Sequence, residues 1–510
     1  MGKNCSCCCG HDYEDHIMKA AVVNPPFMNG RFSRTSRSPA INKSGTLYWP
    51  LWLAHGAGAL EQAGHEVLFL DCPAEGINER DMLRMLAEFN PELTVLDTST
   101  PSIYSDLRLA SMTKKCLPNT FVLLVGTHVS ALPIQCLKLA PSVNGIAVGE
   151  YDITLVDVAE KLDGADDLSG VPGLCLNIRG ELVETGQRAM IEDLDSLPFL
   201  ADIYNRHLKP ENYFFAAARF PSVMTITSRG CPYRCSFCVW PQVMHRESYR
   251  VRSAEHVAEE FGLFKEHFPG IQEIVIEDDT FSIDNSRVEE ISDVLIRNRN
   301  RIPWTANVRA NLSLAAMRKM KAAGCRLIIV GYESGSQEIL NAVSKGTTVA
   351  QNMEFAERAG KAGLLVHGCF MAGNPGETPQ TLEETFQMSL KLAPDTAQFF
   401  PIMAYPGTRL YNLYRSEGKL RTGNFNRWVT EEGLHDCVVN LPELPSEALV
   451  EWCNSARKRF YLRPGYILYK GLQSLRHPFT EGRRTLRAFG TFRKHLFRRS
   501  KVSGDLGGGK

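Results

Sequence analysis

Apolar residues in the first third of the chain form short runs that alternate with segments of helical periodicity. The runs are Ile17–Val23, Glu66–Leu70, Leu93–Asp97, Phe121–Gly126 and Gly145–Gly149. Amphipathic stretches such as Pro50–Gly64 and Glu79–Phe89 lie between them. Uninterrupted apolar runs of this length are typical of strands buried on both faces. The alternation therefore predicts an α/β domain over residues 17–162, a doubly wound parallel sheet with helices on both faces.

From residue 222 onwards, apolar runs and helical segments alternate again with a longer period. The expected strands are Val223–Thr227, Glu273–Glu277, Thr305–Arg309, Arg326–Gly331, Leu364–Met371 and Ala397–Ala404. The expected helices include Ala254–Phe268, Leu314–Ala323, Ala350–Ala362 and Gln380–Ala393. Six repeats over residues 222–420 predict a partial (β/α)6 barrel, whose chemistry lies at the carboxyl ends of the strands.

Segments of different composition surround these two predicted domains. They are a Cys-rich N-terminal tail (1–16), a connector (163–221), a basic helical C-terminal extension (421–502) and a disordered tail (503–510). Within the connector, Leu174–Thr185 is typical of a hairpin that turns at Arg179-Gly180. The insertion Phe27–Tyr48 interrupts the first strand–helix connection, and a loop of that length is usually functional or disordered.

The overall composition excludes several classes of protein. Of 510 residues, 57 are Lys or Arg and 57 are Asp or Glu, and this balance excludes polyanion binding along the whole chain. No apolar run approaches the roughly 18–20 residues of a membrane span. The start of the chain lacks the apolar core of a signal peptide. We therefore expect a cytoplasmic protein.

The fifteen cysteines are an odd and high number. In a long chain without a secretory signal they are better interpreted as thiols, metal ligands or catalytic groups than as a disulfide framework. Most are isolated in apolar or mixed surroundings, where a buried thiol is the usual interpretation. The first cluster comprises Cys5, Cys7, Cys8 and Cys9. It could hold a second iron–sulfur cluster or zinc, or it could be an irregular start of the chain. The second cluster, Cys231, Cys235 and Cys238, indicates the function.

The second cluster lies on a short loop that directly follows the first barrel strand. The sequence Ser228–Pro241 contains Cys231, Cys235 and Cys238 in the spacing C-x3-C-x2-C. Three thiolates suit a [4Fe-4S] cluster whose fourth iron keeps an open position. Zinc is the competing interpretation, but it prefers four ligands, and His245 is the nearest candidate for a fourth.

This loop resembles the signature of the radical S-adenosylmethionine (SAM) superfamily, and the resemblance extends over residues 223–420. It implies that the amino and carboxylate groups of SAM bind the open iron. It also implies that an electron from the cluster cleaves SAM to methionine and a 5′-deoxyadenosyl radical. That radical removes a hydrogen atom from an unactivated C–H bond, and the protein supplies orientation and a dry cavity.

Further strand ends resemble the SAM-binding positions of the family. They supply Glu277, Arg309, Glu333, Ser334 and Gly373. The resemblance implies that Glu277 faces the SAM amino group, that Arg309 pairs with the carboxylate, and that Glu333 reaches the ribose hydroxyls. The turn that starts at Gly373 resembles the adenine-side turn. Its Glu377 is alternatively an acid at the start of a helix.

A sheet domain before such a barrel resembles the cobalamin-binding branch of the superfamily. The loop positions that carry this resemblance are Gly126, His128, Ser130 and Gly149. The sequence D-x-H-x-x-G, which supplies a histidine to cobalt in many cobalamin domains, is absent from the chain. The resemblance therefore implies cobalamin bound without that histidine. The alternative is a sheet that binds substrate or only packs against the barrel.

The C-terminal extension is strongly basic. Between Arg457 and Lys501 there are fourteen Lys or Arg residues and one acid. Within Arg483–Arg499, apolar residues recur at helical spacing among arginines. Such a helix can lie in an anionic membrane interface, or it can cover the open side of the barrel. No recognised nucleic-acid module accompanies the charge, so we expect no nucleic-acid partner.

The sequence thus predicts a cobalamin-dependent radical SAM enzyme that methylates an unactivated carbon of a small molecule or lipid. Carbon–carbon bond formation, cyclisation or rearrangement by the same radical is the alternative. A non-catalytic iron–sulfur sensor is a third hypothesis. The expected partners are the substrate and an electron donor such as a ferredoxin or flavodoxin. Peripheral association with the inner face of a membrane would follow from the basic extension.

Overall fold

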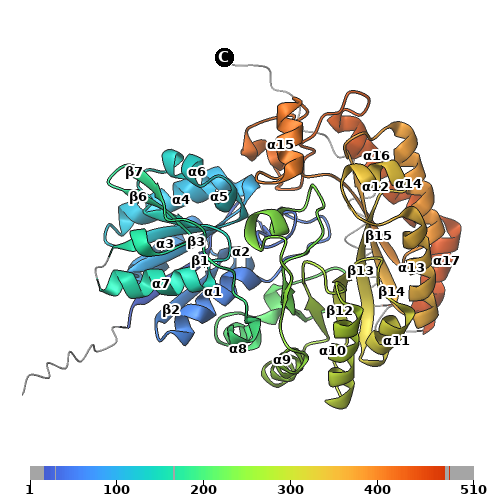
Figure 1. Ribbon diagram of the computed structural model, residues 1–510, viewed down its shortest axis with the longest axis horizontal. Helices are drawn as coiled ribbons and strands as arrows, with labels where there is room; N and C mark the ends of the chain where they lie inside the picture. Colours follow the sequence, from blue (N-terminus) through green and yellow to red (C-terminus); the bar gives the residue numbers. More distant parts are fainter. Residues whose placement is uncertain (1–16, 29, 165–166, 477–481, 483–510) are drawn as a thin grey trace, which may run out of the picture.

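The computed structural model describes residues 17–28, 30–164, 167–476 and 482. They form two α/β bodies that lie side by side, each built on its own sheet (Figure 1). This arrangement confirms the predicted fold class, an N-terminal parallel sheet followed by a partial barrel. The Cys-rich tail and the C-terminal tail predicted at 503–510 lie outside the described residues.

The N-terminal sheet has seven strands in the order β2-β1-β3-β4-β5-β6-β7. They are β1 (Lys19–Asn24), β2 (Glu66–Asp71), β3 (Leu93–Thr98), β4 (Phe121–Gly126), β5 (Gly145–Ala147), β6 (Leu174–Ile178) and β7 (Glu181–Glu184). Strands β1 to β5 are parallel, as their uninterrupted apolar runs predict. The order reverses between β1 and β3, so the loops that follow these two strands diverge to opposite faces.

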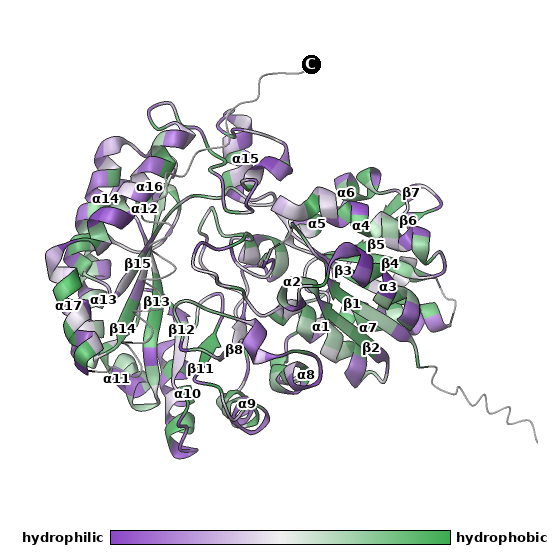
Figure 2. Cartoon of the chain, turned by 180° about the vertical axis from the view of Figure 1, so that it is seen from behind, coloured by the Kyte–Doolittle hydropathy of each residue, from purple (hydrophilic) through white to green (hydrophobic). Residues whose placement is uncertain are grey.

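Helices cover both faces of this sheet. They are α1 (Leu51–Gln62), α2 (Cys72–Glu75), α3 (Glu79–Phe89), α4 (Ile103–Cys116), α5 (Thr127–Ala131), α6 (Pro133–Leu139) and α7 (Asp152–Asp163). Helices α1 and α7 pack together on one face, and α3 packs against α4 on the other. Figure 2 shows the consequence, green hydrophobic strands enclosed by helices with purple outer faces.

The predicted hairpin forms, but it belongs to the first sheet and not to a separate connector. Strand β6 pairs antiparallel with β5, and β7 pairs antiparallel with β6. Arg179 and Gly180 both have positive φ angles, 53° and 95°, as a tight two-residue hairpin turn requires. The pairing satisfies backbone groups that β5 would otherwise leave open at the sheet edge. Helix α8 (Leu200–His207) then packs on both α1 and α9 (Ala254–His267) and so bridges the two bodies.

The second sheet has six parallel strands in sequential order. They are β8 (Ser222–Thr225), β11 (Glu273–Ile276), β12 (Trp304–Val308), β13 (Cys325–Glu333), β14 (Leu365–Ala372) and β15 (Thr396–Pro401). Each strand is added to the same edge as the one before, and the sheet curls towards a barrel. Because the strands are parallel, all their carboxyl ends lie at one rim. Strands β8 and β15 are the two edges of the described sheet, so the barrel is incomplete between them.

Helices follow each barrel strand and cover the outer face (Figure 1). They are α9 (Ala254–His267), α10 (Asn285–Arg297), α11 (Leu314–Ala322), α12 (Gln337–Ala342), α13 (Val349–Ala362) and α14 (Pro379–Leu392). The five longest begin behind a residue whose side chain accepts a hydrogen bond from the first turn: Ser253, Asp284, Ser313, Thr348 and Thr378. These caps explain why the predicted starts agree with the observed ones within one residue.

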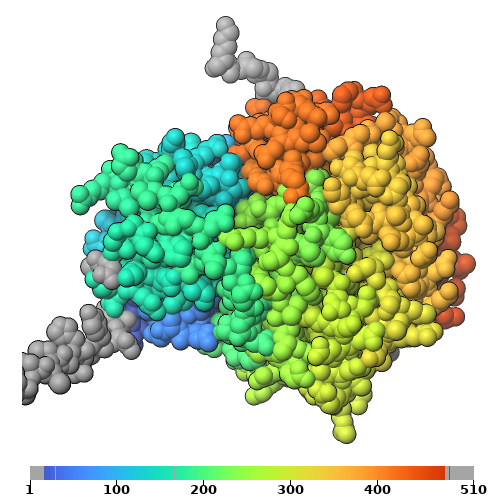
Figure 3. All heavy atoms as spheres, viewed as in Figure 1, coloured from blue at the N-terminus to red at the C-terminus, as the bar shows by residue number. Residues whose placement is uncertain are grey.

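The chain after the barrel folds back over its open side. The helices are α15 (Arg409–Ser416), α16 (Ser446–Tyr461) and α17 (Pro464–Arg476), and α16 packs on the edge strand β15. A short 3-10 turn, Phe425–Trp428, packs on α4 of the first body. The space-filling view shows the two bodies in contact, with the orange segment around α15 resting on both (Figure 3). The predicted basic helix at 483–499 lies outside the described residues.

Candidate cofactor and substrate cavity

The three cysteines of the second cluster line one cavity at the carboxyl rim of the barrel. Their loop runs between the short strands β9 (Ser228–Arg229) and β10 (Arg250–Val251), which pair antiparallel and close its base. Cys231 and Cys235 are 7% exposed, and Cys238 is partly buried. The loop therefore presents all three thiols to the same enclosed space.

The donor set fits an iron–sulfur cluster better than a single zinc ion. Among the described residues, no three His, Cys, Asp or Glu side chains converge closely enough to hold one metal ion. His245, the candidate fourth zinc ligand, is 1% exposed, and its Nδ1 lies 2.8 Å from Asp279 Oδ2. A cubane is larger than a single ion, so its three thiolates stand further apart.

Positive charge surrounds the three thiols. Burial raises the pKa of Cys231 and of Cys238, whereas Arg309 lowers the former and Arg37 lowers the latter. Arg309 Nη1 also lies 3.7 Å from Cys235 Sγ. Because metal ligation requires thiolates, these guanidinium groups stabilise the form that a cluster needs.

In the acidic turn after β11, two carboxylates hold the cysteine loop and the third, Glu277, lines the cavity. Asp278 accepts hydrogen bonds from the backbone and hydroxyls of Thr227 and Ser228. Asp279 accepts one from the Gly230 backbone at 3.0 Å. These two carboxylates fix the start of the cysteine loop. Glu277 lines the cavity, and its burial raises its pKa.

Arg309 and Glu333, for which SAM contacts are predicted, line the cavity next to the thiols. The Arg309 guanidinium lies 3.5 Å from the centroid of the Tyr233 ring. Glu333 Oε1 lies 2.7 Å from Lys345 Nζ, and both side chains are 8% exposed. Arg309 also donates to the Lys345 carbonyl oxygen. The arrangement is a compact polar site of alternating charge.

Two predicted SAM residues do not reach the cavity. The Ser334 hydroxyl lies 3.1 Å from Thr385 Oγ1, on the outer side of β13. A Cβ on Gly373 would lie 3.0 Å from Val439 and 3.1 Å from Leu449, so this turn faces the C-terminal segment. Helix α14 covers Ser334 and the chain after the barrel covers Gly373, and the sequence alone reveals neither contact.

Glu377 has a local role in the same turn. Its Oε2 accepts hydrogen bonds from the backbone amides of Gly373 and Asn374, the latter at 2.9 Å. Burial raises the pKa of Glu377 to about 7. The carboxyl group thus binds its own turn just before α14 and does not line the cavity.

The predicted cobalamin contacts gather at the carboxyl edge of the N-terminal sheet. Gly126 has a φ of 112°, and a Cβ there would lie 2.4 Å from the Thr98 carbonyl oxygen. The Ser130 hydroxyl accepts a hydrogen bond from the Gly149 amide at 3.0 Å. A Cβ on Gly149 would lie 3.6 Å from the Met244 carbonyl oxygen of the cysteine loop. This edge therefore faces the barrel across a narrow space.

His128, for which a cobalamin contact is predicted, is buried and already contacts other side chains of the protein. Its Nδ1 lies 3.0 Å from Thr100 Oγ1, and its ring contacts Phe425. Burial lowers the pKa of His128 to about 3, so the imidazole is neutral. His128 is therefore not free to bind cobalt, and cobalamin at this edge would be held without a histidine ligand, in agreement with the missing D-x-H-x-x-G sequence.

The insertion between β1 and α1, which the sequence left as functional or disordered, is an ordered part of both bodies. Arg34 is fully buried and pairs with Asp106 at 2.6 Å. Three residues later, Arg37 pairs with Glu277 at 3.4 Å and with Asp279 at 3.5 Å. Neither arginine is among the predicted site residues, although the Arg-rich composition of the insertion is a signal.

A second pair of ionic contacts joins the bodies at the base of the cysteine loop. Arg229 donates to both Asp152 carboxylate oxygens, at 2.7 and 3.0 Å. Arg250 binds Glu150 in the same bidentate manner. Glu150 and Asp152 follow Gly149 directly. The Gly149-Glu150 loop is thus a contact between the bodies, which its sequence did not indicate.

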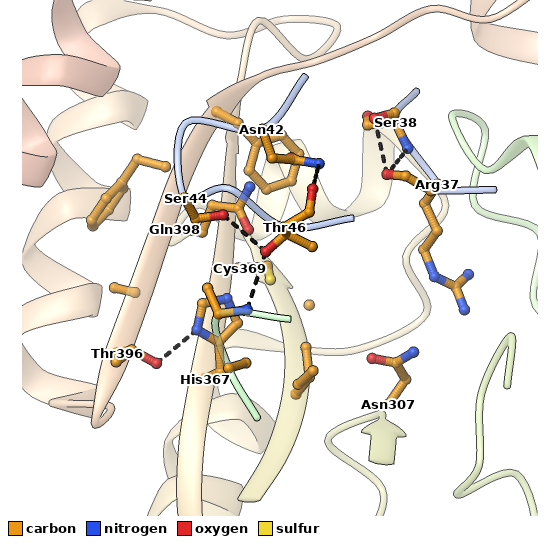
Figure 4. Close-up of a pocket in the computed structure, with 18 of the residues that line it drawn as sticks. Arg37, Ser38, Asn42, Ser44, Thr46, Asn307, His367, Cys369, Thr396 and Gln398 are labelled. Atoms are coloured by element: carbon orange, nitrogen blue, oxygen red, sulfur yellow. Dashed lines mark hydrogen bonds between the residues drawn. The ribbon is translucent and has the colours of Figure 1, made fainter. Parts of the chain in front are cut away.

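The cavity has a volume of about 1250 Å³ and extends far beyond the three thiols. The insertion forms one wall, and the inner faces of β14 and β15 form the opposite one. Figure 4 shows residues from both walls, Asn42, Ser44 and Thr46 of the insertion together with His367, Cys369 and Gln398 of the strands. Large ligand sites are typically about 300–1000 Å³. The cavity therefore has room for a second molecule beside SAM.

Comparisons with known proteins agree with this geometry. The family description "Radical SAM superfamily" matches residues 225–389, and "B12 binding domain" matches residues 37–159. An uncharacterized methyltransferase, PH0819 of Pyrococcus horikoshii, is 30% identical over 89% of this chain and 94% of its own length. The anaerobic magnesium-protoporphyrin IX monomethyl ester cyclase of Cereibacter sphaeroides is 26% identical over 82% of this chain and 68% of its own length.

A solved structure shows the same fold. The radical SAM methyltransferase TsrM from Kitasatospora setae, with cobalamin and a [4Fe-4S] cluster bound, aligns with a TM-score of 0.68 at 17% identity. The alignment covers 88% of this chain and 90% of TsrM. The cysteine loop, the two matched domains and the relative from Pyrococcus horikoshii all support one assignment. The chain belongs to the radical SAM superfamily, in the branch that carries a B12-binding domain.

Proposed function

We propose that this protein is a cobalamin-dependent radical SAM methyltransferase that acts on an unactivated carbon. The observation that carries the proposal is the single cavity that holds three thiols at one end and a large unfilled volume at the other. The 30% identical relative, which carries the name methyltransferase, supports transfer of a methyl group. The B12-binding domain at the edge of this cavity supplies the site for cobalamin.

The residues of the chain bind and orient the reactants. When bound, the cluster supplies a reducing electron to SAM and cobalamin supplies a transferable methyl group. Arg309 pairs with the SAM carboxylate, Glu277 accepts from its amino group, and Glu333 accepts from the ribose hydroxyls. At the carboxyl edge of the N-terminal sheet, Gly126, Ser130 and Gly149 would contact cobalamin. The buried walls exclude water, which protects reactive species from side reactions.

Ring formation or rearrangement is the second candidate function. The 26% identical relative from Cereibacter sphaeroides, which is a cyclase by name, favours it. Methyl transfer consumes two molecules of SAM and yields both 5′-deoxyadenosine and S-adenosylhomocysteine. A cyclase yields 5′-deoxyadenosine without S-adenosylhomocysteine. The two functions therefore differ in their SAM products.

The proposal is tested by the cofactors and products of the purified protein. After anaerobic reconstitution with iron, sulfide and cobalamin, we expect a [4Fe-4S] spectrum, bound cobalt and reductive cleavage of SAM. With an accepted substrate, S-adenosylhomocysteine and 5′-deoxyadenosine should form together. Persistent absence of bound cobalt, with 5′-deoxyadenosine as the sole nucleoside product, would favour the cyclase.

Cysteine variants provide the matched control. Cys238→Ala should remove the cluster absorbance and SAM cleavage, because two thiolates do not hold the cubane. Cys116→Ala changes an exposed cysteine on α4 and should leave both unchanged. SAM cleavage by Cys238→Ala would refute the proposed cluster site.

We further propose that a ferredoxin or flavodoxin donates the electron that the cluster passes to SAM.

We also propose that the protein associates with the surface of an anionic membrane. Helix α17 supports the membrane proposal, since Leu468 and Leu475 are 65% and 79% exposed. The segment that follows is rich in Lys and Arg. Exposed apolar and basic groups together favour binding to an anionic bilayer. Among the described residues, no helix is long and apolar enough to span a membrane.

A further inference from the structure

The part of the cavity away from the thiols has a predominantly aromatic and aliphatic wall. It extends from the insertion across β15 to α16 and α17, and its apolar lining includes Phe214, Phe215, Phe399, Tyr461, Tyr466 and Ile467. Aromatic and aliphatic walls bind apolar surface by burial. This half of the cavity therefore fits a molecule whose body is apolar.

Several cations interrupt this apolar wall, and two of them, Lys43 and Arg457, face each other's charge. Lys43 comes from the insertion and Arg457 from α16, and both line the cavity. Arg457 donates to the Asn454 side chain at 3.0 Å and to the Phe399 carbonyl oxygen at 3.1 Å, and both acceptors are neutral. Lys43, on the insertion, places a positive charge at the same part of the cavity. Within the described part of the chain, no carboxylate forms an ion pair with either cation.

The two cations are close enough to repel each other. Burial lowers the pKa of Lys43, and the nearby Arg457 lowers it further, whereas the more weakly acting Glu432 raises it. His435, next to Lys43 in the cavity, adds no charge, because burial lowers its pKa to about 4. Two like charges in a largely apolar space are unfavourable without a counter-ion in direct contact.

The other end of the cavity shows what a neutralised site looks like. There, Lys345 pairs with Glu333 at 2.7 Å, and Arg37 pairs with Glu277 at 3.4 Å. Each of those cations has a carboxylate of the same chain. The contrast indicates that the charge of Lys43 and Arg457 is balanced by a ligand.

We propose that the substrate is an anionic amphiphile, with its apolar body along β14 and β15 and its carboxylate or phosphate ester between Lys43 and Arg457. This inference rests on the proposed function only where it names the bound molecule as the substrate. Arg457 presents planar donors that match either anion, and Lys43 adds a point charge. The aromatic wall binds the remainder of the molecule.

Binding of simple probes tests the proposal without turnover. Equilibrium dialysis measures the affinity of the reconstituted protein for radiolabelled oleate and for radiolabelled oleyl alcohol, which has the same chain without the charge. We expect oleate to bind more tightly than the alcohol. In the double variant Lys43→Met and Arg457→Met, oleate affinity should fall at least about tenfold, because two charged contacts are lost. Binding of oleyl alcohol should be unchanged.

Two further variants separate charge from folding. Lys458→Met removes an exposed cation one residue further along α16 and should bind both probes like the wild type. The exchange Lys43→Arg with Arg457→Lys keeps both charges and should retain oleate binding. Equal oleate affinity in the double Met variant would overturn the proposal. So would wild-type protein that binds oleyl alcohol as tightly as oleate.

The same samples distinguish this inference from the proposed function. Cluster absorbance and reductive SAM cleavage report on the proposed enzyme, and the dialysis reports on the anion site. Charge-independent probe binding with intact SAM cleavage refutes the anion site alone. Charge-dependent oleate binding by a protein that does not cleave SAM supports the anion site and refutes the proposed enzyme.

Discussion

Arg309 illustrates how single side chains at the cysteine loop are held before any ligand binds. Its guanidinium stacks on Tyr233, approaches Cys235 and donates to the backbone of Lys345. These contacts fix the planar group at the rim while leaving it exposed to the cavity. An arginine held in this way can receive a carboxylate with little further ordering, which favours binding.

Arg309→Lys should weaken SAM binding by about tenfold or more, because lysine keeps the charge but loses the bidentate geometry and the stacking. The cluster absorbance should be unchanged. Equilibrium binding of SAM to the reconstituted protein measures the effect. Arg358→Lys is the control, since Arg358 on α13 donates only to backbone carbonyls of Leu312 and Ala310 and to the neighbouring Glu354. If both variants bind SAM like the wild type, Arg309 is not a SAM contact.

Short-range spacing predicted the cysteine loop, because all three thiols lie within eight residues. The other cavity residues come from distant segments, and no local pattern joins them. Arg37 and Lys43 belong to an insertion, whereas Arg457 lies in the last third of the chain. Gly373 shows the converse, since it follows a barrel strand as expected but is covered by residues that come later. Packing between remote segments decides both cases.

The barrel and sheet elements followed from periodicity because buried parallel strands carry continuous apolar runs. The pairing of the hairpin β6–β7 did not follow, because its partner β5 is set by the edge of the finished sheet. The exposure of the apolar face of helix α17 could not be predicted from periodicity either. Its apolar residues Leu468, Leu472 and Leu475 are exposed, and exposure depends on what the rest of the fold covers.

The double variant Leu468→Ser and Leu475→Ser should bind phosphatidylglycerol vesicles about thirtyfold more weakly than the wild type. Each exposed leucine contributes roughly 1 kcal/mol when its surface is partly buried in the interface. Vesicle flotation measures the bound fraction. Ile134→Ser with Leu139→Ser removes two exposed apolar residues from α6 and should have no effect. Unchanged flotation of the α17 variant would exclude this helix as the membrane contact.

The two bodies form one structure because charged groups from each are buried at their contact. Arg229 is 1% exposed and binds Asp152 of the other body through two hydrogen bonds. Burial alone would raise the pKa of Asp152, but Arg229 outweighs it and holds that pKa below its usual value. The contact lies at the base of the cysteine loop, so it positions the cluster end relative to the N-terminal sheet.

Arg229→Met should lower the free energy of unfolding by roughly 3–5 kcal/mol at neutral pH, because it leaves Asp152 buried without its partner. Since the folded-state pKa of Asp152 is depressed, the stabilisation is complete above the ordinary Asp pKa of about 4. It is lost as the pH falls through the depressed value. Thermal unfolding of the apoprotein should therefore show a difference between wild type and variant that shrinks in acid.

Arg84→Met removes an exposed arginine from α3 and serves as the control, with an expected effect of less than about 0.5 kcal/mol. A second variant, Arg229→Met with Asp152→Asn, should recover part of the lost stability, because the asparagine leaves no buried charge. If Arg229→Met unfolds like the wild type at neutral pH, this contact does not hold the bodies together.

The insertion between β1 and α1 has a consequence for how such enzymes diversify. One wall of the cavity is encoded in the first fifty residues, and the opposite wall is encoded more than three hundred residues later. The cysteine loop belongs to neither wall. Changes around Lys43 can thus alter which molecules are accepted, whereas changes at Arg37 also reach Glu277 and the thiol of Cys238. Selectivity can therefore vary independently of reactivity only in the part of the insertion that lies beyond Arg37.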